Sequence, residues 1–277
     1  MDGDLPRGLP GDLLRPPLDA LAVRDGLVGP GLPWRRLDVV EETGSTNADL
    51  LARCAAGIDI DGSVLLAEYQ HAGRGRHGRQ WSAPPRSQIA MSVGVDASSV
   101  PRSGWGWLPL ATGVAVVDAL AAGSGVRAGL KWPNDVMLGG GKLAGILAEV
   151  AVPNPVIVVG LGLNVTMTAD EAPDPGATSL LLAGSPADRN VLTASILREL
   201  ARRIRQWRAA GGANRALHDD YRRYSLTLGR RVGAALPGGC HIAGLAREVD
   251  ELGRLCIDTG EQTATISAGD ITHLRAL

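Results

Sequence analysis

The chain has 277 residues, of which 45% are hydrophobic and 21% are charged, and its formal net charge at pH 7 is −1. A chain of this length can bury one large core and carry a small second domain. The near-neutral charge argues against a protein that binds nucleic acid or an anionic membrane surface. The longest apolar stretch, residues 156–165, falls short of the roughly 18 residues that a membrane span needs. The acidic, proline-rich N-terminus does not resemble a secretory signal, so we expect a cytoplasmic protein.

Two residue types give further limits. Cys54, Cys240 and Cys256 lie far apart and form no CxxC pair, which predicts reduced thiols and neither a disulfide framework nor a zinc site. Only two of the 28 basic residues are lysines, Lys131 and Lys142, so the other 26 are arginines. Codon bias and chance are one explanation of such a pair, and the less favoured one. The alternative is that at least one of the two positions needs a compact ammonium and cannot accept a planar guanidinium.

The texture of the sequence divides the chain into three parts. Residues 1–33 hold six prolines and six glycines, which predicts a flexible segment with at most a short helix at 18–27. This segment leaves no room for a helix-turn-helix. Residues 34–225 mix strands and amphipathic helices and predict an α+β domain. Residues 226–277 hold short strands between glycine turns, which is typical of a small β-barrel.

The expected elements follow from apolar periodicity and from turn residues. In chain order they are a strand at 37–40, a helix at 48–56 capped by Ser45 or Thr46, strands at 63–69 and 89–95, a buried helix at 105–122, strands at 130–132 and 143–150 around a Gly-Gly-Gly hairpin turn, a strand at 155–165, helices at 188–210 and 213–224, and strands at 231–236, 240–249, 255–257 and 263–267.

The connection after Tyr69 is rich in glycine and arginine. It contains GxGxxG, but it runs into Trp81 and two prolines and opens no helix, so a dinucleotide-binding turn is not expected. A mobile loop of this composition could close over an anion with guanidinium and backbone N–H donors, while Trp81 covers a base or an apolar ligand. The alternative is a solvated basic loop. The residues concerned are Arg74, Gly75, Arg76, His77, Arg79 and Trp81.

Four further motifs carry polar side chains at exposed ends or in buried strands. Lys142 follows a glycine turn and starts an apolar strand, where its ammonium could bridge a carboxylate and a phosphate. Asn134 and Asp135 follow a proline near the same edge, although Asn-Asp after proline is also ordinary turn chemistry. Asn164 lies within an apolar strand, where its amide needs a partner, either structural or a ligand. Gly-Ser-Thr-Asn at 44–47 is consistent with a simple helix cap.

Five motifs together carry a resemblance to a known family. They are Gly-Ser-Thr-Asn at 44–47, Ala-Glu-Tyr-Gln-His-Ala-Gly-Arg-Gly-Arg-His-Gly-Arg-Gln-Trp at 67–81, Lys-Trp-Pro-Asn-Asp at 131–135, Gly-Lys-Leu-Ala-Gly-Ile-Leu-Ala-Glu at 141–149 and Gly-Leu-Gly-Leu-Asn-Val at 160–165. In this order and at these spacings the chain resembles the biotin protein ligases. The resemblance implies a mixed-sheet α+β catalytic domain of the class II synthetase-like type and a C-terminal SH3-like barrel.

The resemblance also implies an activity and a set of site residues. The activity is a carbon–nitrogen ligation in which biotin and ATP, with Mg²⁺, form biotinyl-5′-AMP, and the biotin then passes to a lysine of the biotin carrier domain of an acyl-CoA carboxylase. The catalytic residues implied are Lys142, Arg74 and Arg76. The biotin site implied comprises Ser45, Thr46, Asn47, Gln70, Arg74, Gly75, Arg76, Lys142 and Gly145. The ATP site implied comprises Arg76, His77, Arg79, Trp81, Asn134, Lys142 and Asn164, and Asp135 is implied in activation of the acceptor lysine.

Other functions compete with this interpretation. A lipoate ligase or octanoyltransferase shares the catalytic fold, but the arginine-rich loop and Gly-Ser-Thr-Asn favour biotin. A non-enzymatic biotin- or nucleotide-binding module would not need Lys142. Some members of the family also repress transcription through an N-terminal DNA-binding domain, and we expect this chain to be of the kind that binds neither DNA nor membrane. The sequence contains no cluster of carboxylates, so we expect no dedicated protein site for the metal.

Overall fold

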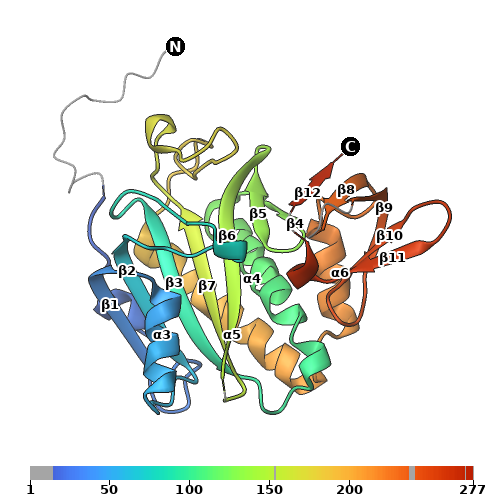
Figure 1. Ribbon diagram of the computed structural model, residues 1–277. Helices are drawn as coiled ribbons and strands as arrows, with labels where there is room; N and C mark the ends of the chain where they lie inside the picture. The colour runs from blue at the N-terminus through green and yellow to red at the C-terminus, as the bar shows by residue number, and fades with distance from the viewer. Residues whose placement is uncertain (1–14, 153, 237–240, 272, 277) are drawn as a thin grey trace.

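The computed structural model describes residues 15–152, 154–236, 241–271 and 273–276, which form two sheets with helices packed between and around them (Figure 1). The large sheet has the strand order β1-β2-β3-β7-β6-β5-β4. Only the β1–β2 pair is parallel, so the sheet is mixed, as predicted. The strands are β1 (Arg36–Thr43), β2 (Ser63–Gln70), β3 (Gln88–Asp96), β4 (Gly129–Lys131), β5 (Asp135–Leu138), β6 (Gly141–Ala151) and β7 (Val156–Asn164).

The two faces of the large sheet differ because side chains alternate along each strand. On one face, β3 and β7 direct large apolar side chains such as Met91 and Leu161 into the main core. The helices α4 (Trp107–Ser124), α5 (Arg189–Ala210) and α6 (Arg215–Tyr224) lie on this side (Figure 1). On the other face the same strands carry small or polar residues beneath α3 (Thr46–Ala55). The second face therefore has room for a ligand where the first does not.

Capping residues fix where these helices begin. Ser45 Oγ accepts the backbone N–H of Ala48 at 3.5 Å and starts α3, as the sequence predicted. Asp188 and Asn214 cap α5 and α6 in the same way. Residues 102–123, which include most of α4, are long and apolar enough to cross a membrane, but 67% of an apolar 18-residue stretch within them is buried inside the fold. We therefore assign α4 as a core helix.

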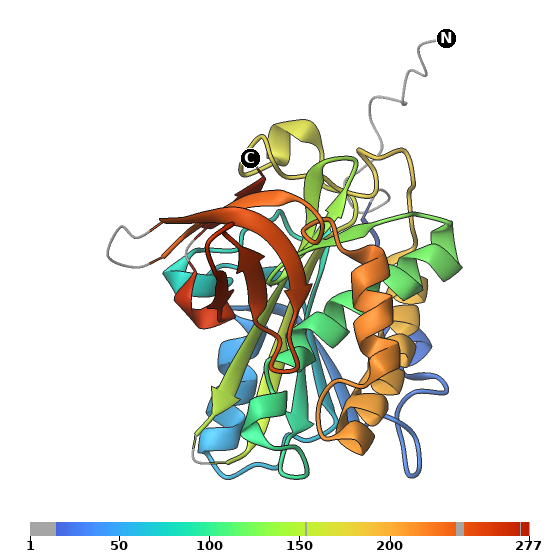
Figure 2. The same cartoon turned by 90° about the vertical axis from the view of Figure 1, so that its right-hand side faces the viewer.

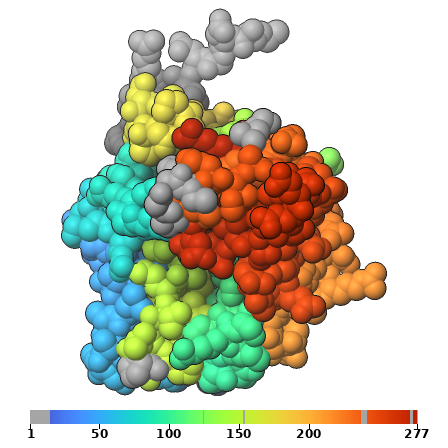
Figure 3. Space-filling model, turned by 45° about the vertical axis from the view of Figure 1, so that its right-hand side comes forward, coloured from blue at the N-terminus to red at the C-terminus, as the bar shows by residue number. Residues whose placement is uncertain are grey.

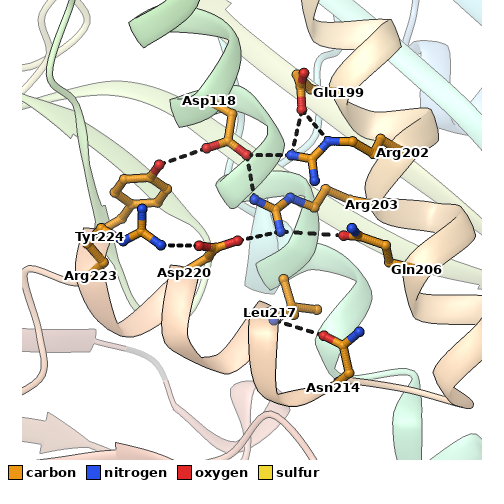
Figure 4. A network of polar contacts seen from close by, with 10 residues as sticks. All are labelled: Asp118, Glu199, Arg202, Arg203, Gln206, Asn214, Leu217, Asp220, Arg223 and Tyr224. Carbon is orange, nitrogen blue, oxygen red and sulfur yellow. Dashed lines mark hydrogen bonds and ion pairs between the residues drawn. The ribbon is translucent and has the colours of Figure 1, made fainter.

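A buried arginine joins the three core helices (Figure 4). Arg203 of α5 is only 3% exposed and donates to Asp118 of α4 and Asp220 of α6, both at 2.6 Å. Tyr224 donates to the other oxygen of Asp118 at 2.8 Å. These bonds fix the end of α6. Just after this helix the N–H of Leu226 donates to the carbonyl of Leu130 in β4, and the chain then enters the second sheet.

The second sheet is small, antiparallel and strongly curved (Figure 2). Its order is β11-β10-β9-β8-β12, and its strands are β8 (Arg231–Ala235), β9 (His241–Val249), β10 (Leu255–Asp258), β11 (Thr263–Ile266) and β12 (His273–Ala276). The indole N–H groups of Trp107 and Trp132 donate to the carbonyls of Asp250 and Gly253, at 3.0 and 3.1 Å. The second sheet is therefore bound directly to the helices and to the edge of the large sheet.

Three sequence expectations need correction. The glycine hairpin joins β6 to β5, whose first residue is Asp135, and not to β4. The sequence pattern did not indicate β5 as a strand, because β5 is short and begins with a polar residue that is typical of a turn. Gly139 and Gly140 have positive φ, as a tight hairpin requires. The short strand β12 was also missed. Cys240 lies outside the described residues, while Cys54 and Cys256 are buried thiols.

The third correction concerns residues 15–33, which pack against the main core, while residues 1–14 lie outside the described part. The helix α2 (Ala20–Arg24) buries Val23 completely, and Leu27 is also in the main core. Ahead of the helix, the carboxylate of Glu68 accepts the N–H of Leu18 and also pairs with Arg189 at 2.7 Å. Proline and glycine content indicated flexibility, but the apolar residues between them are enough to anchor the segment.

The buried Glu68–Arg189 pair should be a main determinant of stability. Their side chains are 2% and 5% exposed, so Glu68→Gln leaves a buried, unpaired guanidinium, and we expect a loss of about 3–5 kcal/mol in the free energy of unfolding. Urea unfolding measures this loss. Asp59→Asn, which breaks the exposed Arg35–Asp59 pair, serves as the control and should leave the unfolding midpoint nearly unchanged. Equal midpoints for the two variants would contradict the prediction.

Stability should also fall in mild acid because of His218. Its ring packs against Trp107 in a tilted arrangement, with centroids 4.2 Å apart and 56° between the ring planes, and burial lowers the pKa of the imidazole, an effect that Glu251 partly offsets. The unfolded chain, with an ordinary histidine pKa of about 6.5, takes up the proton first as the pH falls. Stability is therefore lost as the pH drops below about 6.5 toward the lower folded pKa. His218→Gln should flatten this slope in unfolding experiments between pH 7 and 5, and an unchanged slope would contradict the assignment.

Candidate active site

A cavity of ≈ 320 Å³ opens on the α3 side of the large sheet. Its walls come from the start of α3, the loop between β2 and β3, the β5–β6 hairpin, the segment after β7 and the second sheet. Figure 3 shows this loop (teal) and the second sheet (red) above β6 and β7 (yellow-green). The cavity is lined by every site residue expected from the sequence: Ser45, Thr46, Asn47, Gln70, Arg74, Gly75, Arg76, His77, Arg79, Trp81, Asn134, Asp135, Lys142, Gly145 and Asn164.

The floor of the cavity is made by glycines on β6 and β7. Gly145 and Gly162 are register partners, and Gly160 lies two residues before Gly162 on the same face. A Cβ on Gly160 would stand 2.3 Å from Asn47 Oδ1, and one on Gly162 would stand 2.4 Å from the ring of Trp81. The backbone of the sheet is therefore in direct contact with the functional side chains, which only glycine permits at these positions.

One end of the cavity is a buried polar pocket. Gln70 Oε1 accepts the backbone N–H of Thr46 at 2.8 Å and its hydroxyl at 3.1 Å. The Thr46 hydroxyl also lies 2.6 Å from Ser92 Oγ, which donates to Asn47 Oδ1 at 2.6 Å. All four side chains are at most 8% exposed. This end can therefore recognise a compact polar group that both donates and accepts hydrogen bonds.

A carboxylate holds the loop at the entrance of this pocket. Glu149 Oε1 pairs with Arg74 at 2.7 Å, and Glu149 Oε2 accepts the amide of Asn47 at 2.8 Å. The Arg74 side chain is about half exposed, whereas that of Glu149 is 20% exposed. An entering anion can thus compete with Glu149 for Arg74 without disturbing the buried part of the site.

Lys142 lines the same cavity. Its Nζ lies 2.7 Å from Asp135 Oδ1 and 5.5 Å from the centroid of the Trp81 ring. The backbone N–H of Lys142 donates to the carbonyl of Gly176 at 2.6 Å, and its carbonyl accepts the N–H of Thr178 at 2.9 Å. These two bonds fix the backbone from which the ammonium extends. Lys142 can interact with two anions at once, because an ammonium offers three donors.

The far side of the loop is bound to the second sheet. Arg76 donates to the carbonyls of Ala268 and of Ile271, the latter at 3.1 Å, and to Asn134 Oδ1 at 3.3 Å. His77, with a left-handed φ of 55°, places Nε2 2.7 Å from the same Ile271 carbonyl. Burial lowers the pKa of Arg76, an effect that Asp135 partly offsets, but the guanidinium stays charged at neutral pH.

Asn164 closes the end of the floor. Its Nδ2 donates to the carbonyl of Thr178 at 2.9 Å, which fixes the orientation of the amide. Its Oδ1 is buried and has no hydrogen-bond partner among the described residues. A buried acceptor without a partner is costly, so Asn164 Oδ1 is available to a donor on a ligand.

The comparisons with known proteins agree with this geometry. Residues 45–164 match the biotin/lipoate A/B protein ligase family, and residues 227–274 match the biotin protein ligase C-terminal domain. The chain is 58% identical over 268 residues to the biotin–[acetyl-CoA-carboxylase] ligase of Mycobacterium tuberculosis, covering 95% of this chain and 98% of that relative. The chain belongs to the biotin protein ligase family.

More distant relatives share the same fold. The bifunctional ligase/repressor BirA of Escherichia coli is 32% identical over 77% of this chain and 66% of its own length. A structure of the Aquifex aeolicus biotin protein ligase, in complex with biotin and ATP, superposes with a TM-score of 0.75 at 26% identity, covering 88% of this chain and all of that one. These likenesses confirm the predicted α+β catalytic domain with a small C-terminal domain.

Several residues of this biotin ligase site were missed by sequence reasoning. Glu149 was quoted only as part of a motif, and Ser92 is one hydroxyl in an apolar strand, a signal that could have been noticed. Ile271 contributes through its backbone carbonyl, which no sequence pattern reveals. The floor glycines Gly160 and Gly162 were visible in a motif, but their purpose depends on which side chains cross them.

Gly162→Ala should displace Trp81 of this biotin ligase. The new methyl group would stand 2.4 Å from the indole, so the ring must move. The backbone conformation at Gly162 is open to alanine, so we expect the fold to remain. We expect acrylamide quenching of tryptophan fluorescence to increase about twofold if the ring moves into solvent, since most other tryptophans are buried. Gly123→Ala, which meets open space, is the control. Unchanged quenching in Gly162→Ala would show that the floor yields instead.

Proposed function

We propose that this chain joins biotin to ATP as biotinyl-5′-AMP and transfers the biotinyl group to a lysine of a biotin carrier domain. The observation that carries the proposal is that Lys142 lines the same cavity as Thr46 and Gln70 of the polar pocket and as Trp81 and Asn164, with its ammonium 5.5 Å from the centroid of the Trp81 ring. Family membership supports the same reaction.

The polar pocket suits the ureido ring of biotin. That ring carries two N–H donors and one carbonyl acceptor, and Thr46, Asn47, Gln70 and Ser92 supply both kinds of partner in a buried place. A site built to form hydrogen bonds rejects a ligand that leaves its groups unpaired. A simple acyl chain or lipoate, whose ring bears no amide, would leave this pocket unsatisfied.

The cations serve the first step. A carboxylate oxygen of biotin attacks the α-phosphorus, and the bond to the pyrophosphate oxygen breaks. Lys142 would then contact the biotin carboxylate and the α-phosphate, two anions that otherwise repel, while Arg74 and Arg76 close over them. Preorganised cations of this kind stabilise charge as it moves during the reaction. The closed loop also keeps water from the mixed anhydride.

The second step needs a neutral amine. The nitrogen of the acceptor lysine attacks the acyl carbon, the bond to the AMP oxygen breaks and AMP leaves, and the amine loses a proton. Asp135 is our candidate for receiving that proton, since it lines the cavity and its carboxylate lies 2.7 Å from Lys142.

We propose that Mg²⁺ enters with ATP. Among the described residues no group of three or more His, Cys, Asp or Glu side chains forms a metal site, and Asp174 and Asn164 are oxygen donors that line the cavity. Mg²⁺ commonly binds through substrate phosphates with one or two protein oxygens, and the oxygens of Asp174 and Asn164 fit this mode of coordination. When bound, the ion would neutralise phosphate charge.

The domain roles follow from this arrangement. We propose that residues 34–225 bind biotin and ATP and that residues 226–277 hold the nucleotide side of the loop through Arg76 and Ile271. The acceptor would be the carrier domain of an acyl-CoA carboxylase, and the place of reaction the cytoplasm, where ATP and that acceptor meet.

Pyrophosphate release tests the proposal. We expect release from ATP with biotin and not with lipoate, followed by label on the carrier lysine when an apo carrier domain is added. Lys142→Arg should lower the rate by about a hundredfold or more, because a planar fork cannot bridge both anions from the same backbone. Lys131→Arg, at the other lysine, should lose less than about tenfold. Release with lipoate and not with biotin would show that lipoate is the substrate. Full activity of Lys142→Arg would refute the role of Lys142.

A further inference from the structure

A buried glutamine lies directly behind the Trp81 ring. Gln88 is the first residue of β3 and is only 1% exposed. Its Oε1 accepts the indole N–H of Trp81 at 2.6 Å. Because an indole N–H can only donate, this bond fixes the orientation of the amide. The Nε2 of Gln88 is then left without a partner among the described residues.

This half-satisfied amide does not serve stability alone. A buried N–H without a partner is costly, and an apolar side chain of similar size would avoid that cost. What the amide provides at this position is a single acceptor aimed at Trp81. The backbone bond from Trp81 to Gly73 at 2.8 Å fixes the chain but not the direction of the ring.

The acceptor is held on a rigid support. The carbonyl of Gln88 accepts from Arg189 at 3.2 Å, and Arg189 is in turn paired with Glu68. The preceding carbonyl, of Ser87, accepts the N–H of Val165 at 2.9 Å. In the sheet, Gln88 is the register partner of Asn164. The position of Gln88 is therefore fixed relative to the floor of the cavity.

The ring that Gln88 holds is central to the nucleotide side. It covers Gly162 and Gly145, where a Cβ would stand 2.4 and 3.1 Å from ring atoms, and it lies 5.5 Å from the Lys142 ammonium. A rotated indole would collide with this floor or leave Lys142. We propose that Gln88 is a positioning residue for the ATP half of the site, which orients Trp81 through its amide oxygen. This inference rests on the proposed function, because it assigns the Trp81 side to ATP.

Gln88→Leu in the full chain tests the proposal. The probe is α,β-methylene-ATP, titrated by calorimetry in saturating biotin, with biotin titrated separately. We expect the Kd of the ATP analogue to rise about threefold to tenfold, the range for one lost hydrogen bond, with the Kd of biotin and the Tm nearly unchanged. Gln206→Leu, the same change on α5 far from the cavity, is the matched control and should bind both ligands normally. Gln88→Met, which keeps an unbranched side chain, replaces Gln88→Leu if that variant does not fold.

A double-mutant cycle separates positioning from a general packing effect. Trp81→Phe keeps an aromatic face and removes the N–H, so adding Gln88→Leu to it should weaken the ATP analogue no further. Additive losses, a normal Kd for the analogue in Gln88→Leu, or equal weakening of biotin would each overturn the proposal. The proposed function fails separately, if the unsubstituted chain neither binds the analogue nor releases pyrophosphate with biotin.

Discussion

The cavity exists because two neighbouring strands carry no side chains where they pass beneath it. Gly145 on β6 and Gly160 and Gly162 on β7 let Asn47 and Trp81 rest on the sheet backbone itself. A Cβ at Gly160 would collide with Asn47, and one at Gly162 would collide with Trp81. The same strands send Leu161 and its neighbours into the main core on the opposite face. A single strand can thus serve packing and binding, because its side chains alternate.

Above this floor the cations are paired with groups that a substrate can replace. Lys142 contacts Asp135, Arg74 contacts Glu149, and Arg76 contacts backbone carbonyls. These partners keep the positive side chains near their working positions while no anion is bound. They also limit the reorganisation that binding requires, which is the basis of electrostatic preorganisation.

The rest of the fold brings distant segments to that floor. The Arg203 cluster fixes α6, and α6 leads into the second sheet, whose Ile271 carbonyl receives both Arg76 and His77. On the other side, the Glu68–Arg189 pair ties the segment before α2 to the start of β3. Arg203–Asp118, Glu68–Arg189 and Arg76–Ile271 each link residues more than 80 positions apart, so the site depends on the whole fold and not on one motif.

The sequence by itself determined the fold class, the family and about half of the residues that line the cavity. Helix caps, apolar periodicity and glycine turns are local, and the five motifs are contiguous stretches whose spacing can be compared with a family. What only the tertiary structure decided are the partners: Glu149 for Arg74, Gln88 for Trp81, Ile271 for Arg76 and Arg189 for Glu68. It also decided that residues 15–33 are packed, because their few apolar side chains gain their stability from core residues far along the chain. Local patterns specify which side chains are available, whereas their pairing depends on long-range packing that no local pattern records.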